Sequence, residues 1–410
     1  MRRLRPVLLI AVTGIAVAAC SPAGGGTGPT WAASPAPVHG GEGGGGGVTP
    51  IVPVPQPTSG GAGSATGRPG SGPAGGTAPG GSTSGKGIDP LVVATHLTAP
   101  VGLSLLPDGT ALVGERTTGR IVRVQPVAGQ PVPTVRRLAG LDFSGDGGLL
   151  DLAVSPSYAE DNLIYAYVTT AKDNRVVDFT LHGPVTPVLT GIPKGRTGNT
   201  GRIAFGADGE LYVGTGDAGR PALAQDPSSL AGKVLRVDPI GDPPRDNPHA
   251  GSPVWSSGHH VVDGLCAADD ALFEVEAGGN DPDEVNRIVA GDDYGYPVRD
   301  GSTDPPVRTL PAADRSPGGC AVQRGRLWVT SLDGSALLGA PLSGPASAPT
   351  VGTFAPVLVK RYGRLRTVVA APDGALWLTT SNRDGHGRPV AADERVIRYV
   401  SASTDGGSPA

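Results

Sequence analysis

The chain is poor in aromatic residues and has no excess of positive charge. Phe, Trp and Tyr together make up 4% of the 410 residues, and the formal net charge is −4. A chain of this charge has no basic field to attract nucleic acid, so nucleic-acid binding is excluded as a function class. Cysteine is also scarce, with three residues, whereas 66 glycines and 42 prolines are present. This composition is typical of short strands and turns combined with a flexible region.

The first twenty residues have the pattern of a bacterial export signal. Three arginines in the first five residues precede an apolar run at 7–17, which is too short to span a bilayer comfortably. The run ends in Val-Ala-Ala-Cys20, and small residues before a cysteine match a lipobox. We expect residues 1–19 to be a lipoprotein signal peptide and Cys20 to be lipidated. The alternative is an ordinary secretory signal with a chance cysteine.

Acyl chains on Cys20 would hold the protein at the extracytoplasmic face of the cell membrane. After this residue, the chain to position 87 consists mainly of Gly, Pro, Ser, Thr and Ala. Such a segment buries too little apolar surface to offset the entropy of ordering, so we expect 20–87 to be a disordered tether. Residues 403–410 are expected to form a disordered tail.

A short pattern recurs six times between these ends: an apolar strand, a tight turn and a second apolar strand. Three copies contain Pro-Asp-Gly or Ala-Asp-Gly, in which glycine accepts the positive φ of a tight hairpin. Repetition at about 50 residues without helical periodicity predicts an all-β fold, a six-bladed β-propeller over 88–402. A ligand would then sit at the top of the central channel. The copies begin at Gly102, Leu149, Gly201, Gly264, Gly319 and Thr367.

The two remaining cysteines, Cys266 and Cys320, lie near the starts of the fourth and fifth copies in matching registers. In an exported protein, this placement predicts a disulfide between neighbouring blades. A metal pair is the alternative, but no further thiols or clustered histidines accompany them.

Several motifs between residues 145 and 297 resemble the soluble glucose/sorbosone dehydrogenases. They read GDGGLLDLAVSPSYAEDNLIYAYV, GRIAFGADGELYVGTGDAG, DPSSLAGKVLRVDP, NPHAGSPVWSSGHH and DEVNRIVAGDDYGYP. The similarity extends over about residues 91–400. It implies a six-bladed propeller that uses pyrroloquinoline quinone (PQQ) and calcium to oxidise sugars.

The resemblance also places the general base of that reaction. The family has a histidine four residues before the arginine that starts a Gly-Arg strand. Arg202 is that arginine here, and the base position is Gly198. Glycine cannot accept a proton, so the expected catalytic base is absent. His260 is a weak substitute candidate, because histidine is the residue type that most often serves as a general base, although it stands where the family has an arginine.

Other positions depart from the family in the same direction. The family has an asparagine after the arginine that His260 replaces, and this asparagine becomes Val261. Asp146 replaces a longer Gln or Glu of the family. Asp333 stands where the family has a cofactor-facing lysine. Reversing this charge would repel the three carboxylates of PQQ.

Some family features remain. Arg364 and Arg366 match the Arg-X-Arg that grips PQQ, and their i, i+2 spacing predicts that both lie on one face of a strand. The alternative is a solvated strand end. The resemblance further aligns Gly278 and Gly279 with carbonyl ligands of the cofactor calcium. It aligns Glu284 and Tyr294 with a structural calcium site, for which the alternative is a hydrogen-bonded loop staple.

We therefore expect a catalytically degenerate propeller that serves the cell envelope as a ligand- or partner-binding module. Its partner would be a small polar ligand, such as a sugar, or another envelope protein. The alternative is an active PQQ- and calcium-dependent sugar or aldehyde dehydrogenase.

Overall fold

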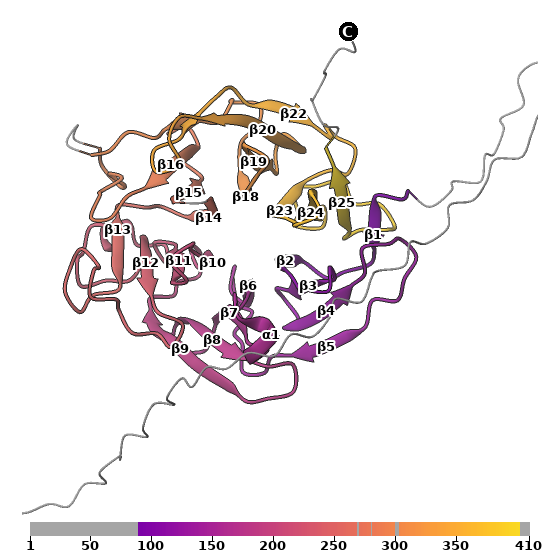
Figure 1. The fold of residues 1–410 in the computed structure, drawn as a ribbon, viewed down its shortest axis with the longest axis horizontal. Helices are drawn as coiled ribbons and strands as arrows, with labels where there is room; N and C mark the ends of the chain where they lie inside the picture. The colour runs from indigo at the N-terminus through magenta and orange to yellow at the C-terminus, as the bar shows by residue number, and fades with distance from the viewer. Residues whose placement is uncertain (1–88, 269, 280, 300–302, 402–410) are drawn as a thin grey trace, which may run out of the picture. The chain divides into compact units, whose positions relative to one another are not determined.

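The computed structural model describes residues 89–401, apart from 269, 280 and 300–302. Six antiparallel sheets in this part of the chain are arranged around a central axis, with the first strand of each repeat innermost (Figure 1). Each of the six repeats supplies the two inner strands of one sheet. The predicted six-bladed β-propeller is therefore confirmed.

Five sheets follow the chain in simple order from the inside to the outside. The first contains β2 (Pro100–Leu105), β3 (Ala111–Glu115), β4 (Arg120–Val124) and β5 (Thr134–Arg137), and the second contains β6 (Leu149–Val154), β7 (Ile164–Thr169), β8 (Asn174–Phe179) and β9 (Val185–Ile192). The third contains β10 (Gly201–Phe205), β11 (Leu211–Thr215), β12 (Lys233–Val237) and β13 (Val254–Ser257). The fourth contains β14 (Val262–Ala268), β15 (Ala271–Glu276), β16 (Glu284–Ile288) and β17 (Arg308–Thr309). The fifth contains β18 (Pro317–Gln323), β19 (Arg326–Ser331), β20 (Ala336–Ser343) and β21 (Thr350–Val351), and β22 (Ala355–Val357) also pairs with β20.

The sixth sheet joins the two ends of the folded region. It contains β23 (Leu365–Ala370), β24 (Ala375–Thr380) and β25 (Val396–Val400), and its outer strand is β1 (Val92–Ala94). Val92 pairs with Ile397 and Ala94 with Val396. Figure 1 shows this closure as an indigo strand beside a yellow one. The ring is thus closed by backbone hydrogen bonds between residues about 300 positions apart.

The hairpin turns have the backbone that their sequence predicts. Gly109, Gly209 and Gly374 have φ values of 80°, 81° and 87°. In each turn the preceding aspartate accepts the N–H of the residue after the glycine, as when Asp108 Oδ1 accepts from Thr110 N at 3.0 Å. These turns fix the register of the inner strand pairs.

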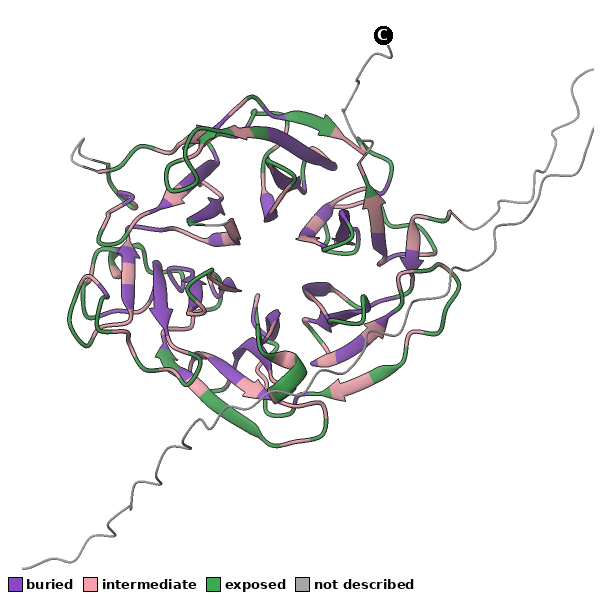
Figure 2. Cartoon of the chain, viewed as in Figure 1, coloured by how far each residue is buried: buried purple, intermediate pink, exposed green. Residues whose placement is uncertain are grey.

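The apolar core lies between the sheets rather than within the channel. Every residue of β3, β7, β11, β15 and β24 is buried (Figure 2). The core clusters each combine side chains of two neighbouring sheets, as where Phe273 of the fourth sheet packs with Leu327 and Val329 of the fifth. Leu, Val and Ala supply most of this packing, which is consistent with the low aromatic content.

Helical structure in the described residues is limited to α1 (Tyr158–Asp161) and the 3-10 turn η1 (Pro221–Ala224). Within those residues no helix has the length and apolar character needed to cross a bilayer. The predicted signal peptide, Cys20, the tether and the C-terminal tail all lie outside the described residues.

Candidate functional site

The inner strands surround a channel with a hollow at each end. One hollow has a volume of about 560 Å³ and lies where β2, β10 and β23 begin. We call it the channel mouth, and it is lined in part by His96, Arg116, Asp146, Arg202, Arg366 and Asp384. The hollow at the opposite end, of about 300 Å³, is lined by the middle and later residues of the inner strands. The mouth therefore combines several arginines with carboxylates.

Arg202 is fixed as a bridge across the channel. Its Nε donates to the carbonyl oxygen of Asp263 at 2.6 Å, and a terminal nitrogen donates to the carbonyl of Gly318. The other terminal nitrogen lies 3.7 Å from Asp151 Oδ1. The side chain is 5% exposed. Arg202 thus connects the inner strands of four sheets, and little of its hydrogen-bonding capacity remains for a ligand.

Arg366 is the freer cation of the mouth. Among the described residues, no acceptor is within hydrogen-bond reach of its buried Nε. Burial lowers the pKa of Arg366 to about 10, and the nearby Arg202 contributes to the decrease. Burial also raises the pKa of Asp263 to about 6, although Arg366 and Arg202 oppose this rise. Arg366 consequently stays charged at neutral pH.

Arg364 faces a neighbouring hollow instead of the mouth. Its Nε donates to Asp384 Oδ2 at 2.8 Å and its terminal nitrogen to Asp333 Oδ1 at 2.7 Å. The register of β23 is irregular between Leu365 and Val368, and Arg364 lies just before this strand. The expected placement of the two arginines on one face of a strand is therefore wrong. Asp333 does more than reverse a charge, because it also neutralises Arg364.

The position of the family's base is sterically closed. Gly198 has φ +70°, and a Cβ atom built on it would lie 2.5 Å from Asp217 Oδ1 and 2.8 Å from the backbone nitrogen of Gly219. The carbonyl of Gly198 accepts the N–H of Ala218 at 3.0 Å. The loop around Gly198 therefore has no room for a side chain in this conformation.

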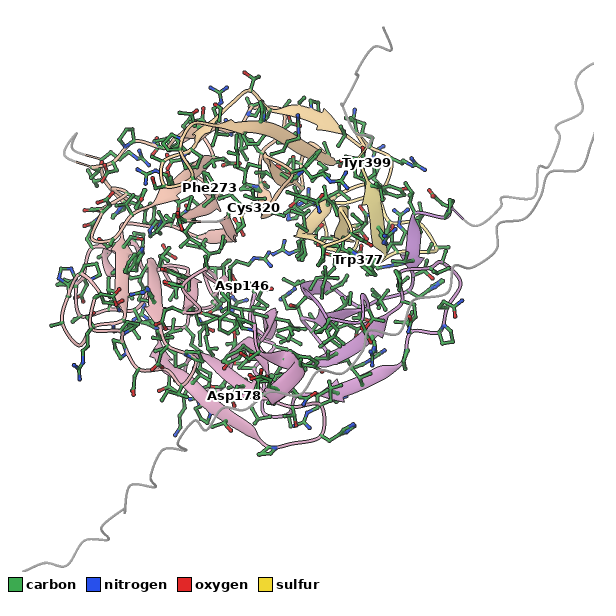
Figure 3. The ribbon with its side chains drawn as sticks, viewed as in Figure 1. Asp146, Asp178, Phe273, Cys320, Trp377 and Tyr399 are labelled. Carbon is green, nitrogen blue, oxygen red and sulfur yellow. A yellow bond between two sulfur atoms is a disulfide. The ribbon has the colours of Figure 1, made fainter. Side chains whose placement is uncertain are left out.

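Asn199, next in the chain, tightens the same loop. It is fully buried, donates to the carbonyl of Gly195 at 2.8 Å and accepts the N–H of Gly195 at 2.9 Å. Its amide nitrogen also donates to the carboxylate of Asp146. Figure 3 shows Asp146 close to the channel axis. The loop thus positions Asp146 as a carboxylate of the mouth.

His260 does not line the mouth. Its Nδ1 lies 2.8 Å from the carbonyl oxygen of Ala277, and its ring stacks on Tyr296 with centroids 4.4 Å apart. Its backbone N–H donates to Glu276 Oε2 at 2.9 Å. These contacts are those of a hydrogen-bonded loop residue.

His96 was missed by the sequence reasoning. It is exposed at the mouth, and its Nδ1 lies 2.9 Å from Thr95 Oγ1. The residue precedes β2 in the loop after β1, with φ 61° and its N–H bonded to the carbonyl of Ala392. No motif surrounds it, so only the closure of the ring by β1 shows that an imidazole reaches the mouth.

Three of the four calcium-type positions, Gly278, Glu284 and Tyr294, have protein partners for their polar groups. The Gly278 carbonyl accepts the N–H of Asp281 at 3.0 Å, and its N–H donates to Asp283 at 3.0 Å. Gly279 has φ +64° and lies beside the ring of His260.

The second pair, Glu284 and Tyr294, is bonded in a similar way. Glu284 accepts from the guanidinium of Arg299. The hydroxyl of Tyr294 accepts from Val289 N at 3.1 Å and donates to the carbonyl of Arg287. These hydrogen bonds are those of a loop staple.

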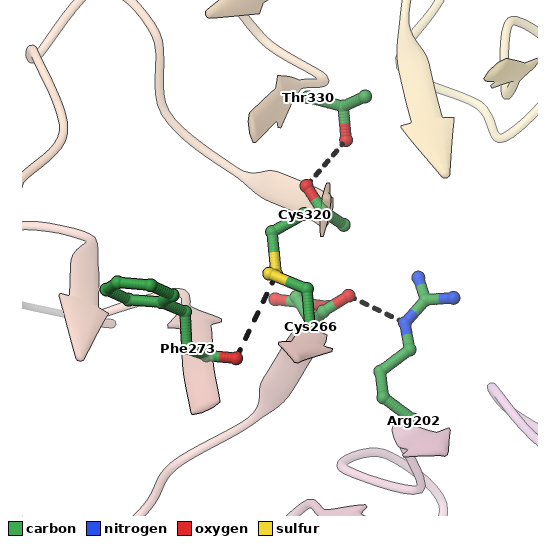
Figure 4. Close-up of a disulfide and its surroundings, with 7 residues drawn as sticks. Arg202, Cys266, Phe273, Cys320 and Thr330 are labelled. Carbon is green, nitrogen blue, oxygen red and sulfur yellow. Dashed lines mark hydrogen bonds between the residues drawn. A yellow bond between two sulfur atoms is a disulfide. The ribbon is translucent and has the colours of Figure 1, made fainter. Parts of the chain in front are cut away.

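The disulfide prediction is confirmed. Cys266 on β14 and Cys320 on β18 are bonded, with their Cα atoms 5.8 Å apart (Figure 4). Both residues line the hollow opposite the mouth. The bond therefore links the innermost strands of two neighbouring sheets without touching the candidate site.

Comparison with known proteins agrees with this architecture. The family model "Glucose / Sorbosone dehydrogenase" matches residues 97–390. The PQQ-bound aldose sugar dehydrogenase of Streptomyces coelicolor is 42% identical in sequence, with a TM-score of 0.70 over 75% of this chain and 95% of that chain. Quinoprotein glucose dehydrogenase B of Acinetobacter calcoaceticus is 31% identical over 255 residues, which are 52% of this chain and 53% of that protein. An aldose sugar dehydrogenase of Escherichia coli is 28% identical over 230 residues, 50% of this chain and 61% of that protein.

The chain thus spans between half and two-thirds of the length of these last two relatives. The family model, in contrast, covers most of the six sheets and their inner strands. On this match, the chain belongs to the glucose/sorbosone dehydrogenase family.

Proposed function

We propose that this propeller is a catalytically degenerate member of its family that binds a small polar ligand at the channel mouth. The closed position at Gly198 carries the proposal. Hydride abstraction from a sugar requires a base within hydrogen-bond reach of the hydroxyl proton. A histidine side chain at this position would overlap Asp217 and the backbone of Gly219. Loss of a general base alone typically lowers the rate about 10²–10⁴-fold.

The residues present also fit PQQ poorly in the manner that the family resemblance implies. The cofactor supplies hydride-accepting chemistry when bound, and its three carboxylates call for cations. Here Arg364 is paired with both Asp333 and Asp384, and Asp333 stands at the position of the family's lysine. Arg366 and Arg116 remain at the mouth, but Arg116 already donates to the carbonyl of Gly147, and the carboxylates of Asp146 and Asp384 line the same hollow. The Gly278 carbonyl, a calcium-ligand position by resemblance, is already bonded to Asp281 N.

The mouth suits a neutral, hydroxyl-rich molecule. Arg366 offers hydrogen-bond donors and Asp146 offers acceptors, while the volume of about 560 Å³ admits a molecule the size of a sugar. We further propose that lipid on Cys20 holds this module at the extracytoplasmic face of the membrane. The lipobox-like sequence supports this location.

A second candidate function is PQQ- and calcium-dependent oxidation of a sugar or aldehyde. Two observations favour it: the imidazole of His96 at the mouth, and 42% identity to an aldose sugar dehydrogenase solved with PQQ bound. Histidine is the residue type that most often serves as a general base, and His96 lines the mouth.

The two candidates are separated by incubating the purified chain with PQQ, Ca²⁺ and a redox dye across a panel of aldoses. We expect no turnover above the protein-free control, and an increase in Tm with sugars that Arg366→Gln weakens. Turnover that disappears in His96→Gln but survives in the matched exposed variant His182→Gln would establish the second candidate and refute the first.

A further inference from the structure

A group of buried polar side chains lies between the third and fourth sheets, away from the residues that line the mouth. Glu274 and Glu276 alternate along β15, so they project from the same face of the strand. Their cross-strand partners on β16 are Asn286 and Glu284. His259, just after β13, completes the group, and β13, β15 and β16 lie near one another in Figure 1.

Three of these residues bring their ligand-type atoms together. One atom each from His259, Glu274 and Glu276 lies within 4.8 Å of the others. His259 Nδ1 is 4.0 Å from Glu274 Oε2 and 3.9 Å from Glu276 Oε2. These separations are too long for hydrogen bonds. The atoms face one another without bonding directly.

The group also has unpartnered polar atoms in the protein interior. His259 and Glu274 are 0% exposed, and Glu276 is 3% exposed. His259 Nδ1 and Glu274 Oε1 have no hydrogen-bond partner among the described residues. Buried polar groups without partners are rare and costly, so such a set calls for an explanation.

Another buried glutamate shows the usual arrangement. Glu115 is 0% exposed, and its two oxygens accept from Thr98 N at 3.0 Å and from the Thr118 hydroxyl at 2.7 Å. The fold can therefore satisfy a buried carboxylate fully when no ligand is involved. Glu274 differs from this pattern, because its Oε2 accepts from the amide of Asn286 at 3.0 Å while its Oε1 has no partner among the described residues.

The charges of the group are unbalanced as well. Arg299 pairs with Glu284, and Lys233 Nζ donates to three backbone carbonyls. Burial and the positive charge of Lys233 lower the pKa of His259 to about 3, so its imidazole is neutral. Burial raises the pKa of both Glu274 and Glu276, and repulsion from neighbouring carboxylates raises it further, while the charge of Arg299 opposes the rise at Glu276.

The imidazole is prepared to act as a ligand. Its Nε2 lies 2.9 Å from the hydroxyl of Ser256, and its ring stacks on Tyr294 with centroids 4.8 Å apart. Metal-bound histidines commonly donate their second ring N–H to such a partner, which leaves the first nitrogen free to coordinate. With Nε2–H donating to Ser256, Nδ1 presents its lone pair to the two carboxylates.

We infer that His259 Nδ1, Glu274 and Glu276 bind a divalent transition-metal ion, with zinc the ion that this donor set favours. Zinc accepts mixed nitrogen and oxygen ligands at about 2.0–2.2 Å, whereas calcium takes six to eight oxygens. Ligand atoms around tetrahedral zinc are about 3.4 Å apart, so small inward shifts of the three side chains complete the site. The ion would neutralise both carboxylates and link the loop after β13 to β15. The inference is independent of catalysis at the mouth.

The test measures the metal content and Tm of the purified full chain. We expect about one zinc ion per chain after dialysis, a lower Tm after chelation, and recovery with Zn²⁺ but not with Ca²⁺. Glu274→Gln should bind zinc at least tenfold more weakly and lose the zinc-dependent change in Tm. The matched buried variant Glu115→Gln should retain both properties, even if its Tm is lower.

Two results would overturn the inference. The first is a wild-type chain without stoichiometric metal, whose Tm does not respond to added Zn²⁺, Mn²⁺ or Co²⁺. Glu274 and Glu276 would then be neutral acids. The second is full zinc retention in both Glu274→Gln and His259→Gln, which would place the ion elsewhere. If these variants do not fold, the visible spectrum of the Co²⁺-loaded wild-type chain decides, because a site with one nitrogen ligand differs from an all-oxygen site.

Discussion

Replacement of Gly198 by alanine tests whether the family's base position is closed to any side chain. The left-handed backbone at φ +70° costs a residue with a Cβ atom about 1–2 kcal/mol. The added methyl group would also lie 2.5 Å from Asp217 Oδ1 and 2.8 Å from Gly219 N. Overpacking of this kind typically costs about 1–3 kcal/mol. We therefore expect Gly198→Ala to lower the free energy of unfolding by about 2–5 kcal/mol.

The matched control is Gly209→Ala in the β10–β11 turn. Gly209 has φ +81°, but an added Cβ there meets no atom within 4 Å. This variant should lose only the backbone contribution, about 1–2 kcal/mol. Equilibrium unfolding in urea measures both changes under the same conditions. Equal losses for the two variants would show that the loop accommodates a side chain at 198, and the structural argument against a base there would fail.

Three further predictions concern the channel and its surroundings. Replacing both Cys266 and Cys320 with alanine should lower the free energy of unfolding by about 4 kcal/mol in the chain-entropy model. A reductant should also lower the urea concentration at which half of the wild-type chain is unfolded, and an unchanged midpoint would contradict this prediction. Burial raises the pKa of Asp151 to about 6, so its unfolded form ionises first as the pH rises. Its contribution to stability should fall by about 3 kcal/mol between pH 4 and 6. The free energy of unfolding of Asp151→Asn should lack this decrease, and the same dependence on pH in the variant and the wild type would rule this out. Asp333→Asn should leave the Kd for PQQ unchanged by calorimetry, because Arg364 stays paired with Asp384 and faces the neighbouring hollow; tighter binding would show that Arg364 reaches the ligand.

The repeat pattern predicted the fold well because its signals are local. Two apolar strands and the tight turn between them lie within each copy, and three copies have an Asp-Gly turn, so an inner strand pair can be recognised without distant contacts. The outer strands carry weaker signals: β5 and β9 are largely exposed, and little in their composition separates them from loops. The partner of β1 could not be read locally, since it lies at the other end of the domain.

The candidate site was harder to predict because its charges are set by contacts between distant residues. The spacing of Arg364 and Arg366 does not reveal an irregular register in β23, or that Asp333 and Asp384 both reach Arg364. The absence of a histidine at Gly198 was visible in the sequence, but the closed loop around it was not. Likewise, the alternation of Glu274 and Glu276 can be seen in the sequence, whereas the approach of His259 depends on the packing of two sheets.

Closure of the ring by β1 and β25 has a consequence for synthesis of the protein. The first strand to leave the ribosome belongs to the last sheet, and its partner is made about 300 residues later. At about 5–20 residues per second, β1 would wait roughly 15–60 s for β25. During this interval β1 has no sheet to join, because β23, β24 and β25 have not been made, and the nascent chain exposes an unpaired edge that chaperones or export factors could occupy.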